Sequence, residues 1–158
     1  MKKNILFVCT GNSCRSVMAE GLFKHLLGDR AGDFSVGSAG VSAMDGFHAS
    51  PDTVEVMREN GVDVSDHQSR RLNAAMVRTA DRIFVMEQGH KEAILRTWPE
   101  AREKTHLLTE YSTEKGVDRD IPDPMTHPGS YENVFRLIRD GVNGIAATMG
   151  LLKGDRST

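Results

Sequence analysis

The sequence predicts an α/β domain in which a parallel β-sheet carries helices on both faces. Compact apolar runs rich in β-branched residues recur along the chain, as expected for strands that are covered on both sides. Between these runs, apolar residues return at the spacing of amphipathic helices. Strands that alternate with helices form βαβ units, and such units build parallel sheets.

The first part of the chain is predicted to contain two strands and one helix. Residues 5–8 (ILFV) form a compact apolar run that predicts the first strand. The pattern then becomes helical, because Met18, Leu22 and Leu26 share one face. Residues 34–36 predict a short second strand, which leads into the Gly- and Ser-rich stretch GSAGVSAMDG.

The middle of the chain is predicted to add a helix, a strand and a second helix. A helix is expected over 51–60, because Pro51 suits a first helical position and Gly61 ends the pattern. Residues 83–86 predict a strand. Residues 91–96 predict a helix that the following proline terminates.

The last part of the chain is predicted to hold a short strand, a loop and a long helix. Residues 106–108 are the candidate strand, and residues 111–130, rich in Gly, Pro and Asp, predict a loop. A long helix is expected from Tyr131 onward, because apolar residues recur there at a period near 3.6. These residues are Val134, Phe135, Ile138, Val142, Ile145 and Met149.

Length and composition predict a single domain over residues 1–158. Hydrophobic residues make up 39% of the chain and charged residues 27%, which is ordinary for a globular protein. The formal charge of −2 gives no reason to expect nucleic acid as a partner. No run approaches the roughly 18 apolar residues of a membrane span, so we expect a cytoplasmic protein that does not bind membranes. Two cysteines do not predict a disulfide framework there.

The stretch VCTGNSCRS, residues 8–16, is the strongest candidate for a functional site. It follows the first strand and precedes the first helix, at the sheet edge where such folds bind ligands. A helix N-terminus there offers free N–H groups and a positive dipole to phosphate. Gly11 lets the loop fold tightly, and Arg15 adds a bidentate fork. Cys9 would lie beneath the anion in a field that favours the thiolate, an activated nucleophile.

Other interpretations of the two cysteines fit the pattern less well. A metal site would need further soft ligands, and the spacing of Cys9 and Cys14 is not C-x₂-C. A lone cysteine after a strand is more often buried and inert. The strand before the loop, the glycine within it, the serine after the arginine and the helix beyond it together favour the catalytic interpretation.

Cleavage of a phosphate ester also needs a proton donor for the leaving oxygen, usually a carboxylic acid. The candidate is Asp123 in DIPDP, residues 120–124, because the prolines on either side stiffen its loop. Asp120 in the same segment competes for this role. An aspartate before a proline is also a common turn residue.

CTGNSCRS, followed by MAEG and by a late Asp-Pro, resembles the low-molecular-weight protein tyrosine phosphatase family over nearly the whole chain. The resemblance implies a four-stranded parallel sheet flanked by helices, of the flavodoxin- or Rossmann-like type. It implies that Cys9 is the nucleophile, that Arg15 steadies the transition state and that Asp123 is the general acid. It also implies a phosphocysteine intermediate, a phosphorylated protein as substrate, a monomer, and no metal or organic cofactor.

The resemblance assigns roles to further residues. The phosphate-binding loop comprises Thr10, Gly11, Asn12, Ser13, Cys14 and Arg15, and Ser16 donates a hydrogen bond to the thiolate. Asn12 fixes the loop's shape. Ser38 and His67 fall where the family has a serine and a histidine that brace the loop. Cys14 corresponds to a second cysteine that can pair with the nucleophile under oxidation.

The substrate preference follows from departures from the family's pattern. Tyrosine-directed members usually have aromatic residues straight after the Asp-Pro, whereas this chain has Met125 and Thr126. Near residue 44 many members carry another aromatic, and this chain has Met44 with Phe47 close by. Ser13 is closer to the hydroxyl residue of protein-arginine phosphatases. DIPDP and YENVFRLI resemble bacterial tyrosine phosphatases, so phosphotyrosine is the predicted substrate and phosphoarginine the alternative.

Two further classes of function were weighed. Thioredoxin-coupled arsenate reductases share the scaffold and the CTGNSCRS loop, but their chemistry uses two further cysteines in the middle of the chain. No cysteine follows Cys14. A phosphate-binding module without catalysis would have no need of a nucleophile.

Overall fold

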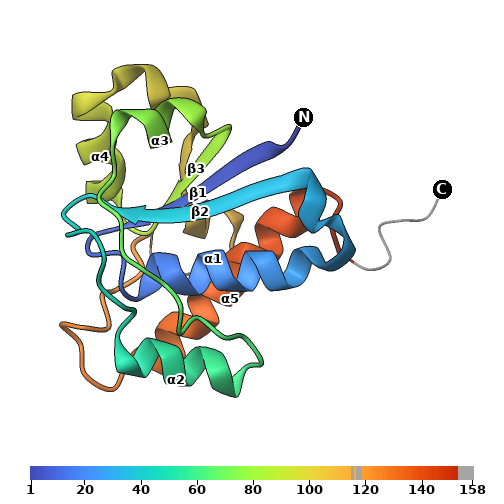
Figure 1. Ribbon diagram of the computed structural model, residues 1–158, viewed down its shortest axis with the longest axis vertical. Helices are drawn as coiled ribbons and strands as arrows, with labels where there is room; N and C mark the ends of the chain where they lie inside the picture. The colour runs from blue at the N-terminus through green and yellow to red at the C-terminus, as the bar shows by residue number, and fades with distance from the viewer. Residues whose placement is uncertain (115, 117–118, 153–158) are drawn as a thin grey trace.

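The computed structural model describes residues 1–114, 116 and 119–152, which form an α/β fold around one sheet. The sheet has four strands, all parallel, in the order β2-β1-β3-β4 (Figure 1). This arrangement confirms the predicted fold class. The strands are β1 (Lys3–Cys9), β2 (Phe34–Gly40), β3 (Arg82–Val85) and β4 (Thr105–Leu107).

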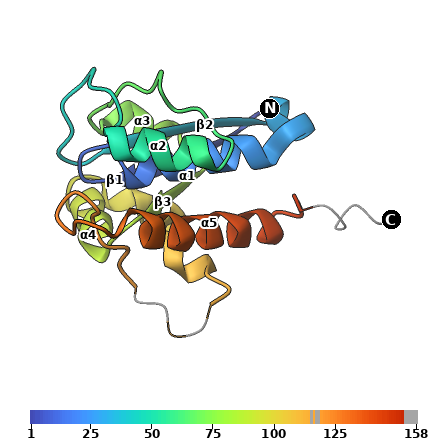
Figure 2. The same cartoon turned by 90° about the horizontal axis from the view of Figure 1, so that it is seen from below.

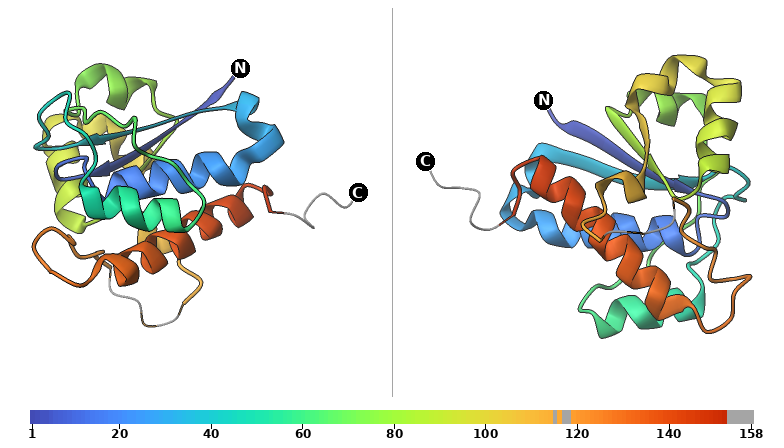
Figure 3. Two further views of the ribbon diagram at one scale, coloured as in Figure 1. Left: turned by 60° about the horizontal axis from the view of Figure 1, so that its bottom comes forward. Right: turned by 180° about the vertical axis from the view of Figure 1, so that it is seen from behind.

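Helices cover both faces of the sheet. Figure 1 shows α1, α2 and α5 on one side and α3 and α4 on the other, and Figure 3 shows the first three packed as one layer. Short 3₁₀ segments lie at 28–33, 99–104 and 108–111. The helices are α1 (Arg15–Leu27), α2 (Pro51–Glu59), α3 (Ala74–Thr79), α4 (Gln88–Thr97) and α5 (Tyr131–Thr148).

The apolar run of β1 contributes side chains to two hydrophobic cores, one on each face of the sheet, because successive side chains of a strand point to opposite faces. Ile5 and Phe7 pack against the layer that contains α1 and α5. Leu6 and Val8 pack against the layer that contains α3 and α4. A strand buried on both faces needs no polar residue between its apolar ones, which explains the continuous ILFV run.

The observed elements differ most from the sequence prediction in three places. Strand β2 continues through GSAG to residue 40 instead of ending near 36, because it pairs with β1 along its whole length. Helix α3 was not predicted, since its six residues are too few to show a helical period. Helix α4 begins at Gln88 rather than 91, because Glu87 and His90 form a reciprocal capping box at its start.

The strand order places the carboxyl ends of β1 and β3 next to each other. From β1 the chain goes outward to β2 on one side, whereas β3 and β4 lie on the other, so the order reverses between β1 and β3. Such a switch point is where open parallel sheets bind ligands. The loop after β1 and the turn into α4 meet there, at the end of the sheet opposite the N-terminus (Figure 2).

Within the described residues, none of the helices combines the length and the apolar character that a bilayer crossing requires.

Candidate active site

The loop that joins β1 to α1 is shaped by Asn12. Asn12 is fully buried and has a φ of 55°, the only positive φ among the described non-glycine residues. Its side-chain amide donates to the hydroxyls of Ser16 (2.8 Å) and Ser38 (2.9 Å), and its carbonyl oxygen accepts from the backbone N–H of Arg70 (2.9 Å). Asparagine tolerates this left-handed conformation better than most residues. Gly11 was predicted to let the loop fold tightly, but the residue with the positive φ is its neighbour Asn12.

Ser38 and His67, the two residues that the resemblance names as braces of the loop, both contact Asn12. The Ser38 hydroxyl accepts from the Asn12 amide and donates to the carboxylate of Glu20, 2.5 Å away. The His67 imidazole lies 2.8 Å from the backbone carbonyl of Asn12. Residues from α1, from β2 and from the segment before α3 thus fix one side chain in the loop. Sequence reasoning missed Glu20, although it lies in the MAEG segment that carries the resemblance.

Gly40 gives the loop room to pass close to the end of β2. A Cβ atom at this position would lie 2.5 Å from the backbone oxygen of Thr10 and 2.9 Å from the backbone nitrogen of Asn12. Real Cβ contacts essentially never come so close, so a side chain here would push the loop out of place. The glycine at the end of GSAG is thus required by a close approach of two backbones.

The Cys9 thiol contacts the hydroxyl of Ser16, with 2.9 Å between Sγ and Oγ. Because the Ser16 oxygen already accepts a hydrogen bond from Asn12, its own hydrogen is free to point at the sulfur. The geometry therefore suits a sulfur that carries negative charge. Cys9 is itself buried, at the carboxyl end of β1.

The start of α1 is open to an anion. Cys14 is the N-cap residue and makes no side-chain capping bond, and the first turn carries no acidic residue. The first backbone N–H groups of a helix have no intrahelical partner, and the dipole makes this end positive. The anion-binding character expected of the loop is consistent with both features.

Arg15 is almost fully buried, with 2% of its surface exposed. One of its terminal nitrogens (Nη1) donates to the carboxylate of Glu87 (2.6 Å) and to the backbone carbonyl of Ile121 (2.7 Å). The other terminal nitrogen (Nη2) donates to the hydroxyl of Thr10 (3.3 Å). A buried charge is tolerated only when it is paired and hydrogen-bonded, and these partners satisfy that condition.

Of the two candidate acids, Asp123 lies at the site. Its carboxylate is 3.8 Å from the second terminal nitrogen of Arg15 and accepts a hydrogen bond from the backbone N–H of Met125 (2.9 Å). The Asp120 carboxylate instead accepts from the backbone N–H of Gln88 (2.7 Å), in the first turn of α4. The structure thus places Asp123 where a substrate could reach it and gives Asp120 a helix-capping role.

Glu87 and His90 are site residues that the sequence analysis did not identify. Glu87 follows β3 and binds Arg15, and His90 lies 2.8 Å from the Thr10 hydroxyl. Burial and the nearby Arg15 charge lower the pKa of His90 to about 4. A polar residue directly after a strand at the switch point was the only available signal, and it pointed to Glu87 alone.

A second polar cluster lies behind the loop. The Tyr131 hydroxyl, at the start of α5, contacts the Cys14 sulfur (3.5 Å), the Ser50 hydroxyl (3.1 Å) and the sulfur of Met125 (3.2 Å). Burial, followed by the contact with Cys14, raises the pKa of Tyr131 to about 12, so this phenol is neutral at ordinary pH. The cluster connects the loop to the segment that carries Asp123.

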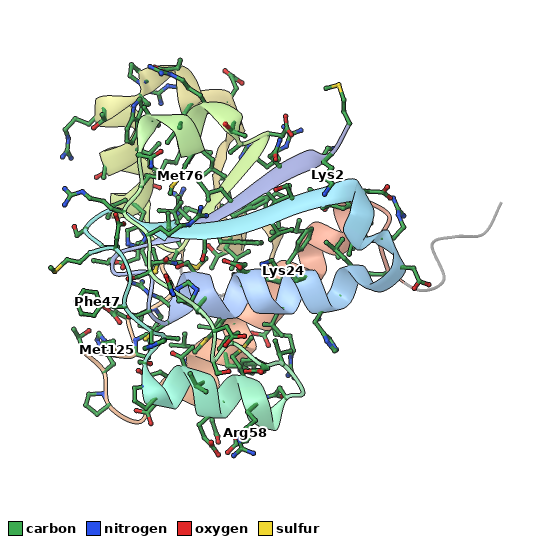
Figure 4. All side chains as sticks on the ribbon, viewed as in Figure 1. Lys2, Lys24, Phe47, Arg58, Met76 and Met125 are labelled. Carbon is green, nitrogen blue, oxygen red and sulfur yellow. The ribbon has the colours of Figure 1, made fainter. Side chains whose placement is uncertain are left out.

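Three large apolar side chains are exposed around the entrance to the loop, namely those of Met44, Phe47 and Met125. Figure 4 shows both Phe47 and Met125 at the end of the molecule where the strands finish. Ser13 is partly buried, and its hydroxyl lies 3.7 Å from the Cys14 sulfur. We call these four residues the entrance residues.

Over the described ranges, no three His, Cys, Asp or Glu side chains come together in a way that could hold a metal ion. What the structure does bring together is a thiol, a buried guanidinium, a helix N-terminus and a carboxylate. Such a set can bind a tetrahedral anion, attack it with sulfur and supply a proton.

Comparison with known proteins gives a consistent result. The sequence pattern of the family described as "Low molecular weight phosphotyrosine protein phosphatase" matches residues 4–153. The low molecular weight protein-tyrosine-phosphatase Ptp of Acinetobacter johnsonii is 39% identical over 86% of this chain and 89% of its own. The protein-arginine-phosphatase of Geobacillus stearothermophilus is 38% identical, over 89% of this chain and 88% of its own.

Other relatives extend the comparison. An arsenate reductase of Halalkalibacterium halodurans is 35% identical over 89% of this chain and 90% of its own. The crystal structure of a low molecular weight protein tyrosine phosphatase from T. tengcongensis superimposes with a TM-score of 0.83 at 34% identity. That superposition covers 93% of this chain and 99% of the other.

Proposed function

Because the chain belongs to the low molecular weight phosphotyrosine protein phosphatase family, we propose that it hydrolyses phosphotyrosine in proteins through a phosphocysteine intermediate. The observation that carries this proposal is the hydrogen-bond chain from Asn12 through Ser16 to Cys9, next to the buried Arg15. This series of hydrogen bonds lets Ser16 donate to a Cys9 thiolate, and an anion site without a nucleophile would not need it.

In the first step, the Cys9 thiolate attacks phosphorus, the sulfur–phosphorus bond forms and the bond to the tyrosine oxygen breaks. Arg15 and the backbone N–H groups of the loop hold the phosphoryl oxygens, where charge builds up in the transition state. Asp123 gives its proton to the leaving oxygen, which departs as a neutral phenol.

In the second step, water attacks the phosphocysteine. Asp123, now a carboxylate, takes a proton from this water as the phosphorus–oxygen bond forms and the sulfur–phosphorus bond breaks. The thiolate leaves as the stabilised partner of Ser16, which is 2.9 Å away. The proposed reaction uses no metal ion or organic cofactor, because these side chains already supply the nucleophile, the anion site and the acid.

The preference for phosphotyrosine rests on the entrance residues. Phe47 and Met125 expose 59% and 58% of their surface, and both lie at the end of the molecule where the strands finish (Figure 4). An exposed aromatic ring can stack on the ring of a bound phosphotyrosine, and a methionine can pack on its edge. Phe47 thereby provides the aromatic contact that Met125 and Thr126 do not.

Phosphoarginine is the second candidate, and Ser13 is the observation that favours it. Its hydroxyl lies in the loop, 3.7 Å from the Cys14 sulfur, and the residue is only partly buried. A hydroxyl at this position could accept a hydrogen bond from a guanidinium N–H of the substrate, whereas a branched apolar residue could not.

The proposal is tested with phosphotyrosine and phosphoarginine peptides of otherwise identical sequence. We expect wild type to turn over the phosphotyrosine peptide faster and Cys9→Ser to turn over neither. Activity that survives in Cys9→Ser would refute the mechanism.

A wild-type preference for phosphoarginine that disappears in Ser13→Ile would replace the first candidate with the second. Arsenate reduction coupled to thioredoxin would overturn both. Phe47→Ala serves as the matched entrance variant, because it should weaken binding of the phosphotyrosine peptide alone.

A further inference from the structure

His90 occupies a place that its role as a helix cap does not fully explain. It lies in the first turn of α4 with 4% of its surface exposed, and both ring nitrogens are hydrogen-bonded. Nδ1 lies 3.1 Å from the backbone nitrogen of Glu87, which closes the helix cap. Nε2 lies 2.8 Å from the Thr10 hydroxyl, 80 residues away in sequence and next to Cys9.

The contact with Glu87 fixes the tautomer of the imidazole. A backbone N–H can only donate, so Nδ1 must accept and carries no proton. The proton of the neutral ring is then on Nε2, which donates to the Thr10 hydroxyl oxygen. The ring stays neutral near pH 7, because burial and Arg15 disfavour its charged form more than Glu87, Asp120 and Asp123 favour it.

The hydroxyl of Thr10 receives a second hydrogen bond from Arg15. The second terminal nitrogen of Arg15 lies 3.3 Å from the same oxygen. Since a hydroxyl oxygen has two lone pairs, both acceptor positions are then occupied by protein donors. The hydrogen of the Thr10 hydroxyl is not used in either of these bonds. Within the part of the chain that the structure describes, the hydroxyl has no protein acceptor for it.

The direction of this hydrogen is set by the two donors. Thr10 directly follows Cys9 and belongs to the loop whose N–H groups face the anion. Its hydroxyl is held from one side by α4 and from another by Arg15, the residue that binds the phosphoryl oxygens in the proposed function. An anion held by Arg15 would lie beside the Thr10 hydroxyl and could offer the acceptor oxygen that its hydrogen lacks.

We propose that His90 is a positioning residue of the reaction, which orients the Thr10 hydroxyl as a hydrogen-bond donor to the phosphoryl group held by the loop. This inference rests on the proposed function, because it deepens the description of the same site. Thr10 touches the substrate, and His90 acts only through Thr10. The start of α4 thereby aims two groups at the anion, Arg15 through Glu87 and Thr10 through His90.

A double-mutant cycle tests whether His90 acts through Thr10. The variants are Thr10→Val, which replaces the hydroxyl with a methyl group of similar size, His90→Leu, and the double variant. Each single change should lower kcat/KM for an aryl phosphate about tenfold, the effect of about one hydrogen bond to a charged group. The double variant should lose little more than either single variant.

Separate roles would give a different result. If His90 only supported the fold, its loss would multiply that of Thr10→Val, and the double variant would be about a hundredfold slower than wild type. Multiplied losses, or an unchanged kcat/KM in Thr10→Val, would overturn the inference. His90→Gln should recover most of the activity, since its amide can also donate to Thr10 and accept from Glu87. His25→Gln, at an exposed histidine of α1, is the control.

The same cycle is run on the dissociation constant of inorganic phosphate, which needs no turnover. Coupled losses in phosphate binding would support the role of His90 even if wild type hydrolysed no aryl phosphate, a result that would refute only the proposed function. Independent losses in phosphate binding, with Cys9-dependent hydrolysis intact, would refute only the role of His90. Thermal unfolding of each variant shows whether the fold is retained.

Discussion

The two halves of the site are held in very different ways. The anion loop, residues 9–16, is anchored in the protein interior by Cys9, Asn12, Arg15 and Ser16, all at 2% exposure or less. Its side chains are bonded to residues of α1, β2, the segment before α3 and the turn into α4. The loop therefore cannot move without disturbing several elements.

In the acid loop, residues 119–130, the part that follows Asp123 is held mainly by bonds within the loop itself. Asp123 exposes 29% of its side chain, and its backbone carbonyl and carboxylate bond to the residues that follow it. Its contacts with the rest of the protein include the backbone bond from Ile121 to Met86 and the contact between Met125 and Tyr131. Ile121 is buried in the core, but residues 125–129 are exposed, so the local stability of the loop after Asp123 should be low.

This difference between the two loops shows which catalytic groups must be held rigidly. Donors that stabilise developing charge are effective only when they are oriented before the reaction starts. A proton donor needs only to reach the leaving oxygen, which differs from substrate to substrate. We therefore expect changes in the anion loop to lower stability and activity together, and changes in the acid loop to lower activity alone.

The largest effect is expected from Asp123→Asn, which should separate activity from stability in the acid loop. The amide keeps an oxygen for the Met125 N–H but supplies no acidic proton. The value of kcat for a poor leaving group should fall by about 10² to 10³, with little loss for a good one. Aryl phosphates of graded leaving-group pKa measure this, and the melting temperature should not change.

Asp120→Asn is the matched control for the acid assignment. It keeps an acceptor for the Gln88 N–H, so neither activity nor its leaving-group dependence should change. Equal slowing of good and poor leaving groups in Asp123→Asn, or leaving-group sensitivity in Asp120→Asn, would show that another group is the acid.

A smaller effect, on stability as well as activity, is expected from Gly40→Ala. The added Cβ would meet the Thr10 oxygen at 2.5 Å, so the anion loop or the end of β2 must shift. Overpacking of this kind should lower the free energy of unfolding by about 3 kcal/mol. It should also lower kcat/KM, because the loop is the displaced element.

Urea unfolding and aryl phosphate kinetics on the same samples measure both effects. Gly32→Ala is the control, since a Cβ there has no atom within 4 Å. Its free energy of unfolding should stay within about 0.5 kcal/mol of wild type. A Gly40→Ala protein with normal stability and activity would mean that the anion loop is more adaptable than its contacts suggest.

The smallest effect is a pH dependence that originates beside the anion loop. The pKa of His90 is about 4 in the folded protein, against about 6.5 in the unfolded chain. Between these values the unfolded chain binds a proton that the folded protein does not. The stability contributed by the neutral imidazole is therefore complete at pH 7 and is lost as pH falls, by about 2 kcal/mol at pH 5.

The His90→Gln variant isolates this effect, because glutamine does not titrate. The difference in free energy of unfolding between pH 7 and pH 5 should be smaller in the variant than in wild type by about 2 kcal/mol. An equal pH dependence of the two proteins would show that His90 is protonated in the folded state at pH 5.

The anion loop was predictable because its signal is local. A strand, a loop with Cys9 and Arg15, and a helix follow one another in sequence, so their proximity needed no knowledge of the fold. Asp123 lies more than a hundred residues from Arg15; its flanking prolines made it a candidate acid beside Asp120, and the family resemblance then assigned it that role. The parallel sheet was predictable from alternating apolar runs, and the structure confirms it.

Features that depend on tertiary contacts were not predictable. The segment MEQGH, residues 86–90, carries no local signal for a functional site. Glu87 and His90 come close to the anion loop only because β1 and β3 are neighbouring strands. The extension of β2 to Gly40 depends on pairing with β1, since its glycines alone would favour a loop. Helix α3 depends on its Asn73 cap and on packing rather than on a visible period.

The burial of Arg15 also determines at which positions mutations could change the substrate preference of this protein. The arginine is among the largest fully buried side chains, so the catalytic apparatus and the folded core share the same atoms. Mutations that retune the chemistry would compromise folding, and selection would remove them. The folded core does not depend in this way on the entrance residues, Ser13, Met44, Phe47 and Met125. A combinatorial library confined to these positions would vary the substrate preference while the fold is retained.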